Sequence, residues 1–129
     1  MLAAVPVAAA APLLAIADGI EKERAEAPEP APVTAKGVRY AALPWGKVRG
    51  LGQNGGYVAA YDRGGRELWV LKVYDVTYDK TREEDKQDVF ITRLALDAEA
   101  RHLVVENERG AIYSVDLRTR AVRALSPRR

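Results

Sequence analysis

Residues 89–117 read VFITRLALDAEARHLVVENERGAIYSVDL, and this stretch decides the fold. Within it, apolar side chains alternate with polar ones over residues 102–106 and 111–117, and Phe90, Leu94 and Leu96 fall on one face of residues 89–97. A period of two is typical of a β-strand that has one face against a core and the other toward water. Short turns separate the segments, the second of them Asn107 to Gly110 (NERG). We therefore predict three consecutive antiparallel strands.

The pattern continues on both sides of this stretch. Residues 57–61 (YVAAY) and 67–78 (ELWVLKVYDVTY) are β-prone runs joined by the turn sequence Asp-Arg-Gly-Gly, and residues 121–125 add a final edge strand. The run 67–78 is apolar on both faces, which predicts a central, doubly covered strand or one that changes layer near Asp75. Helical periodicity is weak after residue 37. The sequence predicts an all-β domain over residues 38–129, a small antiparallel meander of about six or seven strands.

Two stretches resemble repeats of β-propeller proteins. GGYVAAYDRGGRELWVLKV, residues 55–73, resembles the pyrroloquinoline-quinone type of repeat. ITRLALDAEARHLVVENERGAIYSVDLRTRAV, residues 91–122, resembles a whole blade of the WD40-like or quinoprotein-like type. A propeller needs at least four blades and this chain has residues for about two, so it cannot close a ring by itself. The resemblance implies a partial propeller or assembly from several chains, and a two-sheet sandwich or open barrel is the alternative. No cofactor and no binding residue is carried over from the family.

The N-terminal part predicts export. Residues 2–17 are uncharged and apolar, shorter than the roughly 20 residues of a membrane-spanning helix, and end in Ala15-Ile16-Ala17. We predict a signal peptide over residues 1–17 and a periplasmic or secreted protein. Because no Lys or Arg opens the segment, an uncleaved membrane anchor and a disordered leader stay open. Residues 18–37, with alternating prolines at 28, 30 and 32, predict a disordered Pro-rich linker.

Charge and composition limit the classes of partner that the sequence predicts. Twenty basic and 18 acidic residues leave a net charge of +2, so the chain as a whole does not predict nucleic-acid binding. The basic excess is local, because every charged residue after Asp116 is an arginine: 118, 120, 123, 128 and 129. This pattern indicates either a solvated last strand or contact with an anionic surface such as lipid headgroups. The absence of cysteine excludes disulfides and thiolate metal sites.

Two clusters are weak candidates for binding sites. Clustered carboxylates could bind Ca²⁺, although their spacing differs from an EF-hand loop and a solvated loop is the alternative: Asp75, Asp79, Glu83, Asp85 and Asp88. The glycine-rich residues 50–56 lie among aromatic side chains that could form a ligand rim or belong to the core: Tyr40, Trp45 and Tyr57.

No catalytic residue is predicted. His102 is the only histidine, and a triad with Ser114 or Ser126 is formally possible, but no G-x-S-x-G motif is present. We therefore expect an exported, non-enzymatic interaction module with a protein partner, which strand edges could extend by β-augmentation. A small-ligand or Ca²⁺-binding domain and a hydrolase are the alternatives. Exposed edges also make a homo-oligomer possible.

Overall fold

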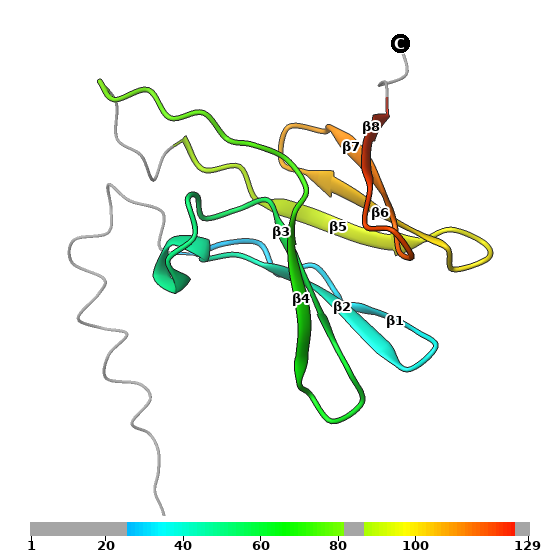
Figure 1. Cartoon of the computed structure of the whole chain (residues 1–129). Helices are drawn as coiled ribbons and strands as arrows, with labels where there is room; N and C mark the ends of the chain where they lie inside the picture. The colour runs from blue at the N-terminus through cyan, green and yellow to red at the C-terminus, as the bar shows by residue number, and fades with distance from the viewer. Residues whose placement is uncertain (1–25, 82–86, 126–129) are drawn as a thin grey trace, which may run out of the picture.

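The computed structural model describes residues 26–81 and 87–125, and this part of the chain is built of β-strands (Figure 1). Two four-stranded antiparallel sheets follow one another along the chain, each with its strands in sequence order. Sheet A comprises β1 (Val33–Ala35), β2 (Val38–Leu43), β3 (Tyr57–Tyr61) and β4 (Glu67–Lys72). Sheet B comprises β5 (Ile91–Leu96), β6 (His102–Asn107), β7 (Ile112–Asp116) and β8 (Val122–Leu125). The all-β prediction is confirmed, with eight strands in the described residues and neither sheet closed into a barrel.

The helical content is small. A four-residue 3₁₀ helix, η3 (Gly46–Arg49), lies in the loop between β2 and β3. No helix in residues 26–81 or 87–125 is long and apolar enough to cross a membrane. The predicted signal peptide, residues 1–17, lies outside the described residues.

Strand β1 lies within the stretch that the sequence predicts to be linker. It pairs with β2 in the register Val33 to Tyr40 and Ala35 to Val38. The two residues between the strands, Lys36 and Gly37, both have positive φ angles, 53° and 82°. Such a turn suits the twist of a hairpin but usually carries Asn or Asp in the first position. A lysine there gives no turn signal, which is why the sequence pattern misses this hairpin.

Two alternatives were open for residues 67–78, and the central strand is wrong, because β4 is an edge strand. The chain instead leaves the sheet within this run, after Lys72 and not near Asp75. The strand ends at Lys72, and the next two residues, Val73 and Tyr74, leave the sheet and are buried in the core. If residues 67–78 are treated as one strand, apolar side chains lie on both of its faces, which is typical of a central strand. In the structure Leu68, on the outer face of β4, is 42% exposed.

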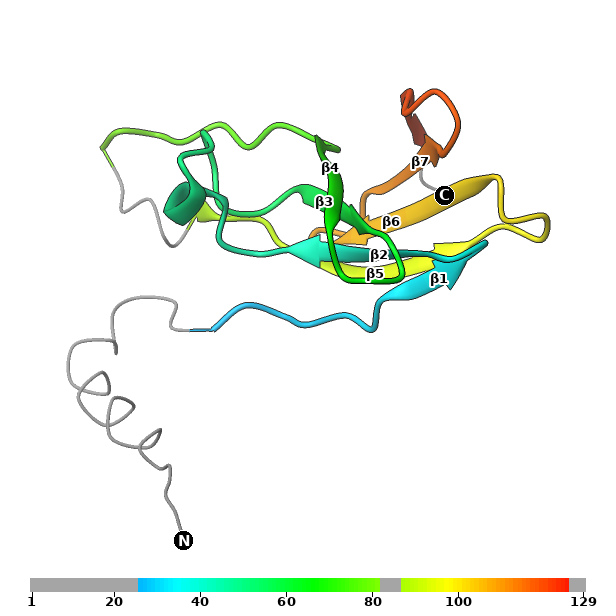
Figure 2. The same ribbon diagram turned by 60° about the horizontal axis from the view of Figure 1, so that its bottom comes forward.

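The two sheets pack face to face, with β5 beside β1 and β2 (Figure 2). Sheet A contributes Val58 and Ala60 to the core between them, and sheet B contributes Leu103, Val105 and Val115; all five are 0% exposed. Each buried aliphatic side chain of the size of valine or leucine stabilises the fold by about 1.5–3 kcal/mol. The inner faces of the two sheets therefore hold the domain together.

The ends of the sheets differ. At one end, which we call the turn end, short turns join β1 to β2, β3 to β4, β5 to β6 and β7 to β8. At the opposite end, the loop end, lie the longer connections, residues 44–56 and 73–90. Residues from three of the turns border a single pocket at the turn end. This pocket is the candidate site.

Candidate anion-binding pocket

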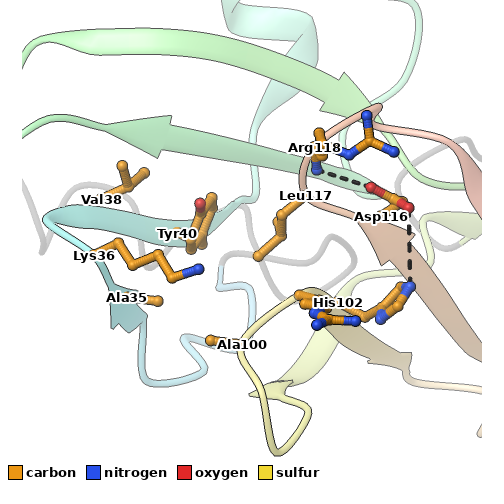
Figure 3. Close-up of a pocket in the computed structure, with 10 residues that line it drawn as sticks. Ala35, Lys36, Val38, Tyr40, Ala100, His102, Asp116, Leu117 and Arg118 are labelled. Atoms are coloured by element: carbon orange, nitrogen blue, oxygen red, sulfur yellow. Dashed lines mark hydrogen bonds and ion pairs between the residues drawn. The ribbon is translucent and has the colours of Figure 1, made fainter.

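The pocket lies between the two sheets at the turn end and has a volume of about 600 Å³ (Figure 3). The β1–β2 hairpin of sheet A contributes Ala35, Lys36, Val38 and Tyr40. The β5–β6 and β7–β8 turns of sheet B contribute Ala100, Arg101 and His102, and Asp116, Leu117 and Arg118. The pocket thus combines aliphatic side chains with three permanent cations, a histidine, a tyrosine and one carboxylate.

Backbone strain is concentrated around this pocket. Among the described residues, three that are not glycine have positive φ: Lys36 at 53°, Ala100 at 58° and Arg120 at 66°. All three lie in turns at the turn end, and the first two line the pocket. An L-residue in this conformation costs about 1–2 kcal/mol, and such residues are often found at binding sites. Their position is a reason to consider the pocket functional.

The acidic residues at this end act as turn caps. Asp116 Oδ1 accepts hydrogen bonds from the backbone N–H groups of Arg118 and Thr119, at 2.8 and 3.0 Å. Asp97 Oδ1 accepts from the N–H groups of Arg101 and His102, at 2.8 and 3.1 Å. The backbone N–H groups of Thr119 and Arg118 lower the pKa of Asp116. Both carboxylates are thereby engaged by local backbone, which offsets part of their charge.

His102 lies between these two carboxylates. Its Nδ1 is 2.8 Å from Asp97 Oδ2, and its Nε2 is 4.0 Å from Asp116 Oδ2. The His102 side chain is the main cause that lowers the pKa of Asp97 to about 2, and the backbone N–H of His102 adds to the effect. Holding Nδ1 against Asp97 leaves Nε2 as the ring nitrogen nearer Asp116, as Figure 3 shows.

This pairing predicts an acid-sensitive fold. The pKa of Asp97 is lower in the folded chain than its ordinary value of 3.8, so its stabilising contribution is complete above pH 3.8 and is lost as pH falls toward 2. We expect the melting temperature of the wild type to fall over this range, and that of Asp97→Asn to start lower and fall less. Thermal melts followed by circular dichroism between about pH 5 and about pH 1.5 measure both slopes. Glu99→Gln, which removes an exposed carboxylate in the same turn, is the control, and parallel curves for Asp97→Asn and wild type would contradict the prediction.

The cations on the rim are only partly neutralised. Arg101 Nε lies 3.2 Å from Glu99 Oε1 in an exposed ion pair. Lys36 and Arg118 form no ion pair with any residue in the described ranges. Both are exposed at the mouth of the pocket. Two unpaired cations facing one cavity create a local positive potential that attracts anions.

Tyr40 supplies a neutral hydrogen-bonding group from inside the pocket. The residue is 7% exposed, and its ring packs against Trp69 with centroids 5.9 Å apart. Its hydroxyl forms no hydrogen bond with any residue that the structure describes. Burial raises the pKa of Tyr40, so the hydroxyl keeps its proton and can donate it to a ligand. A buried hydroxyl without a partner is costly unless a ligand or water satisfies it.

The structure does not assemble the aromatic rim that the sequence suggests. Tyr40 faces the inner side of sheet A, because it pairs with Ala60, whereas Tyr57 pairs with Leu43 and lies on the opposite side. Trp45 is at the loop end, edge-on to Phe90 with centroids 5.2 Å apart. Tyr57 is buried beneath the η3 loop. Only Tyr40 of the three lines the candidate pocket.

The candidate calcium ligands are not gathered around one point in the described residues. Asp75 pairs with Lys72 at 2.6 Å, and Asp79 accepts from the N–H and hydroxyl groups of Thr81. Asp88 accepts from the Tyr78 hydroxyl and from Asn54 Nδ2. Glu83 and Asp85 lie outside the described residues. Within residues 26–81 and 87–125, no group of three or more acidic or histidine residues is placed to hold a metal ion.

The triad considered from the sequence is not formed in the described residues either. Ser114 pairs with Val104, two positions along the ladder from the His102–Asp116 pair, and no hydrogen bond joins the hydroxyl of Ser114 to His102 in this part of the chain. Ser126 lies outside the described residues. The Asp97–His102 pair therefore lacks a nucleophile in contact with the imidazole.

The arginines at the C-terminal end have separate positions. Arg118 lines the pocket, the Arg120 guanidinium lies 5.4 Å from the Trp69 ring centroid, and Arg123 pairs with Ser114 in sheet B. The sequence pattern left two alternatives for this group, a solvated last strand and an anionic contact, and Arg118 is the member that lines a pocket. Lys36 and Arg101 were missed, because one lies in the predicted linker and the other in a turn with no motif.

Comparison with known proteins does not assign the chain to a family. No family model matches the chain, and no curated protein is similar to it.

Proposed function

We propose that this chain is a non-enzymatic binding module that holds a small organic anion, a carboxylate or phosphate ester, in the pocket at the turn end. The observation that carries the proposal is the convergence of Lys36, Arg118 and the buried Tyr40 hydroxyl on one cavity. The cations attract the anionic group, and the hydroxyl offers it a directed hydrogen bond. A hydrogen bond to a charged group stabilises more than one between neutral groups, so this donor favours an anion.

The pocket also favours a ligand with an apolar body. Ala35, Val38 and Leu117 contribute aliphatic surface beside the charged rim. A volume of about 600 Å³ is in the range of pockets that hold small molecules. The combination supports an organic anion over a bare inorganic ion. In an exported protein, as residues 1–17 predict, such a ligand is met outside the cytoplasm.

A binding assay tests the proposal with a matched panel of probes. Phenyl phosphate and benzoate carry the anionic group, benzylamine has a similar body with the opposite charge, and inorganic phosphate lacks the body. We expect phenyl phosphate or benzoate to raise the melting temperature and to give heat on titration, because a ligand that binds only the folded state stabilises it. Benzylamine is expected to have no effect.

Substitutions then locate the site. Tyr40→Phe keeps the ring and removes the hydroxyl, and we expect it to weaken binding about tenfold. Lys36→Gln combined with Arg118→Gln is expected to weaken it at least as much and to reduce its salt dependence. Arg123→Gln, an exposed arginine outside the pocket, is the control. Equal affinity for benzylamine, or unchanged affinity in Tyr40→Phe and the double variant, would refute the proposal.

A further inference from the structure

The side of the pocket that sheet B forms carries hydrogen-bond acceptors as well as cations. Asp116 is the only carboxylate among the described residues that line the pocket, and His102 lies beside it. Figure 3 shows these two side chains across the pocket from Lys36 and Tyr40, which belong to the β1–β2 hairpin. A bound anion accounts for the cations and for the Tyr40 hydroxyl. It does not account for a carboxylate in the same cavity.

The two ring nitrogens of His102 have different roles. Nδ1 lies 2.8 Å from Asp97 Oδ2, and it carries the proton because an ionised carboxylate only accepts hydrogen bonds. In a neutral imidazole the other nitrogen, Nε2, is then an acceptor. It lies 4.0 Å from Asp116 Oδ2, which is beyond hydrogen-bond distance. Asp97 therefore fixes the imidazole so that its accepting nitrogen faces an accepting oxygen.

An ammonium group matches these two acceptors. Asp116 Oδ1 is engaged by the backbone N–H groups of Arg118 and Thr119, at 2.8 and 3.0 Å. The N–H groups of Thr119 and Arg118 also lower the pKa of Asp116, so its carboxylate is ionised near neutral pH. A donor nitrogen about 2.9 Å from each atom can bridge Oδ2 and His102 Nε2, which are 4.0 Å apart. An ammonium group has three N–H donors and the charge opposite to that of Asp116.

A ligand that carries only an ammonium group does not suit the pocket as a whole. Lys36 and Arg118, which form no ion pair with any described residue, give its mouth a positive potential. The ligand must therefore bring an anionic group and an ammonium group together. An amino acid carries both on one carbon atom, and an apolar side chain suits the aliphatic surface of the pocket.

We propose that the ligand of this pocket is an amino acid with an apolar side chain. Its carboxylate lies at Lys36, Arg118 and the Tyr40 hydroxyl, and its ammonium group bridges Asp116 Oδ2 and His102 Nε2. This inference rests on the proposed function and narrows the class of anion that binds. Asp116 is then the residue that distinguishes an amino acid from a simple carboxylate, because its charge attracts the ammonium group of the first and repels the second.

Titration calorimetry of the full chain at about pH 7.5, where an imidazole is ordinarily neutral, tests the inference with two probes. Phenylalanine and 3-phenylpropionate share the aromatic body and the carboxylate and differ only in the ammonium group. We expect phenylalanine to bind at least about tenfold more tightly. Equal affinities would refute this inference and leave the proposed function standing. Absence of binding by both probes would refute the two together.

Substitution of Asp116 then assigns the ammonium group to its partner. Asp116→Asn keeps an oxygen for the turn and replaces Oδ2 with an amide group that donates. We expect this variant to bind phenylalanine about tenfold more weakly and 3-phenylpropionate as tightly as the wild type or more so, which also shows that it is folded. Asp62→Asn is the matched control, because Asp62 Oδ1 accepts from the N–H groups of Gly64 and Arg66 in the β3–β4 turn and Asp62 does not line the pocket. Unchanged binding of phenylalanine by Asp116→Asn, or an equal loss of both probes, would overturn the assignment.

Discussion

Replacing Gly55 with alanine is expected to destabilise the fold by about 3 kcal/mol or more. A Cβ on Gly55 would lie 2.3 Å from the Val89 carbonyl oxygen and 3.1 Å from the Phe90 Cα. Both neighbours are backbone atoms, and both residues are buried, Val89 at 5% and Phe90 at 1% exposed. Neither can move aside as the tip of a flexible side chain can. The added methyl group must therefore push apart the loop of sheet A and the segment that leads into β5.

Gly52→Ala is the control, three residues away in the same loop. A Cβ there meets no atom within 4 Å. We expect this change to alter stability by less than about 0.5 kcal/mol, or to stabilise slightly by restricting the unfolded chain. Urea denaturation followed by circular dichroism compares the two variants with the wild type. Similar midpoints for Gly55→Ala and Gly52→Ala would contradict the close backbone contact.

Replacing Gln53 with leucine is expected to cost about 3 kcal/mol. The Gln53 side chain is buried and bonds only to backbone. Its Nε2 donates to the carbonyl oxygens of Gly55 and Tyr74, both at 2.8 Å, and its Oε1 accepts from the Val76 N–H at 2.9 Å. Leucine is similar in size but has no polar atom. Three backbone groups lose their partner, and each buried group left unsatisfied costs about 1–3 kcal/mol unless water reaches it.

Two measurements separate this effect from a general loss of packing. Urea denaturation gives the change in the free energy of unfolding. Amide hydrogen exchange reports on the Val76 N–H, whose exchange rate we expect to rise in Gln53→Leu relative to the wild type by more than the rates of the core amides of β6. Gln87→Leu is the control, because Gln87 also bonds backbone groups, the N–H and carbonyl of Asp79, but at an exposed position. We expect this control to change stability by less than about 1 kcal/mol. An unchanged Val76 exchange rate would show that Gln53 does not hold this segment.

The loop end shows how a sequence pattern can be ambiguous. Residues 50–56 look like a flexible glycine-rich connection, yet Gln53 is only 5% exposed and Gly55 is buried. Glycine is needed at 55 for close approach of two backbones, and Gln53 replaces missing secondary-structure hydrogen bonds. Neither role is visible in the local sequence, because the partners, Tyr74 and Val89, lie 21 and 34 positions further along the chain.

The order of the strands was more predictable than their environment. Residues 102–106 and 111–117 show a clear period of two, residues 57–61 are β-prone and precede a turn sequence, and the structure has strands β6, β7 and β3 there. Their pairing is between neighbours in sequence, and the turn residues between them set the register. The run 67–78 was misread because burial on both faces resembles a central strand, whereas half of that run leaves the sheet. The resemblance to propeller repeats stays a prediction.

The sequence by itself determined that the chain forms hairpins, because alternation of side chains and short turns act over only a few residues. Only the tertiary structure decided where the pocket lies. Lys36 and Tyr40 belong to the first hairpin of sheet A, and Arg118 follows the third strand of sheet B. They meet because the apolar inner faces of the two sheets pack together, a contact between distant parts of the chain that no local pattern records.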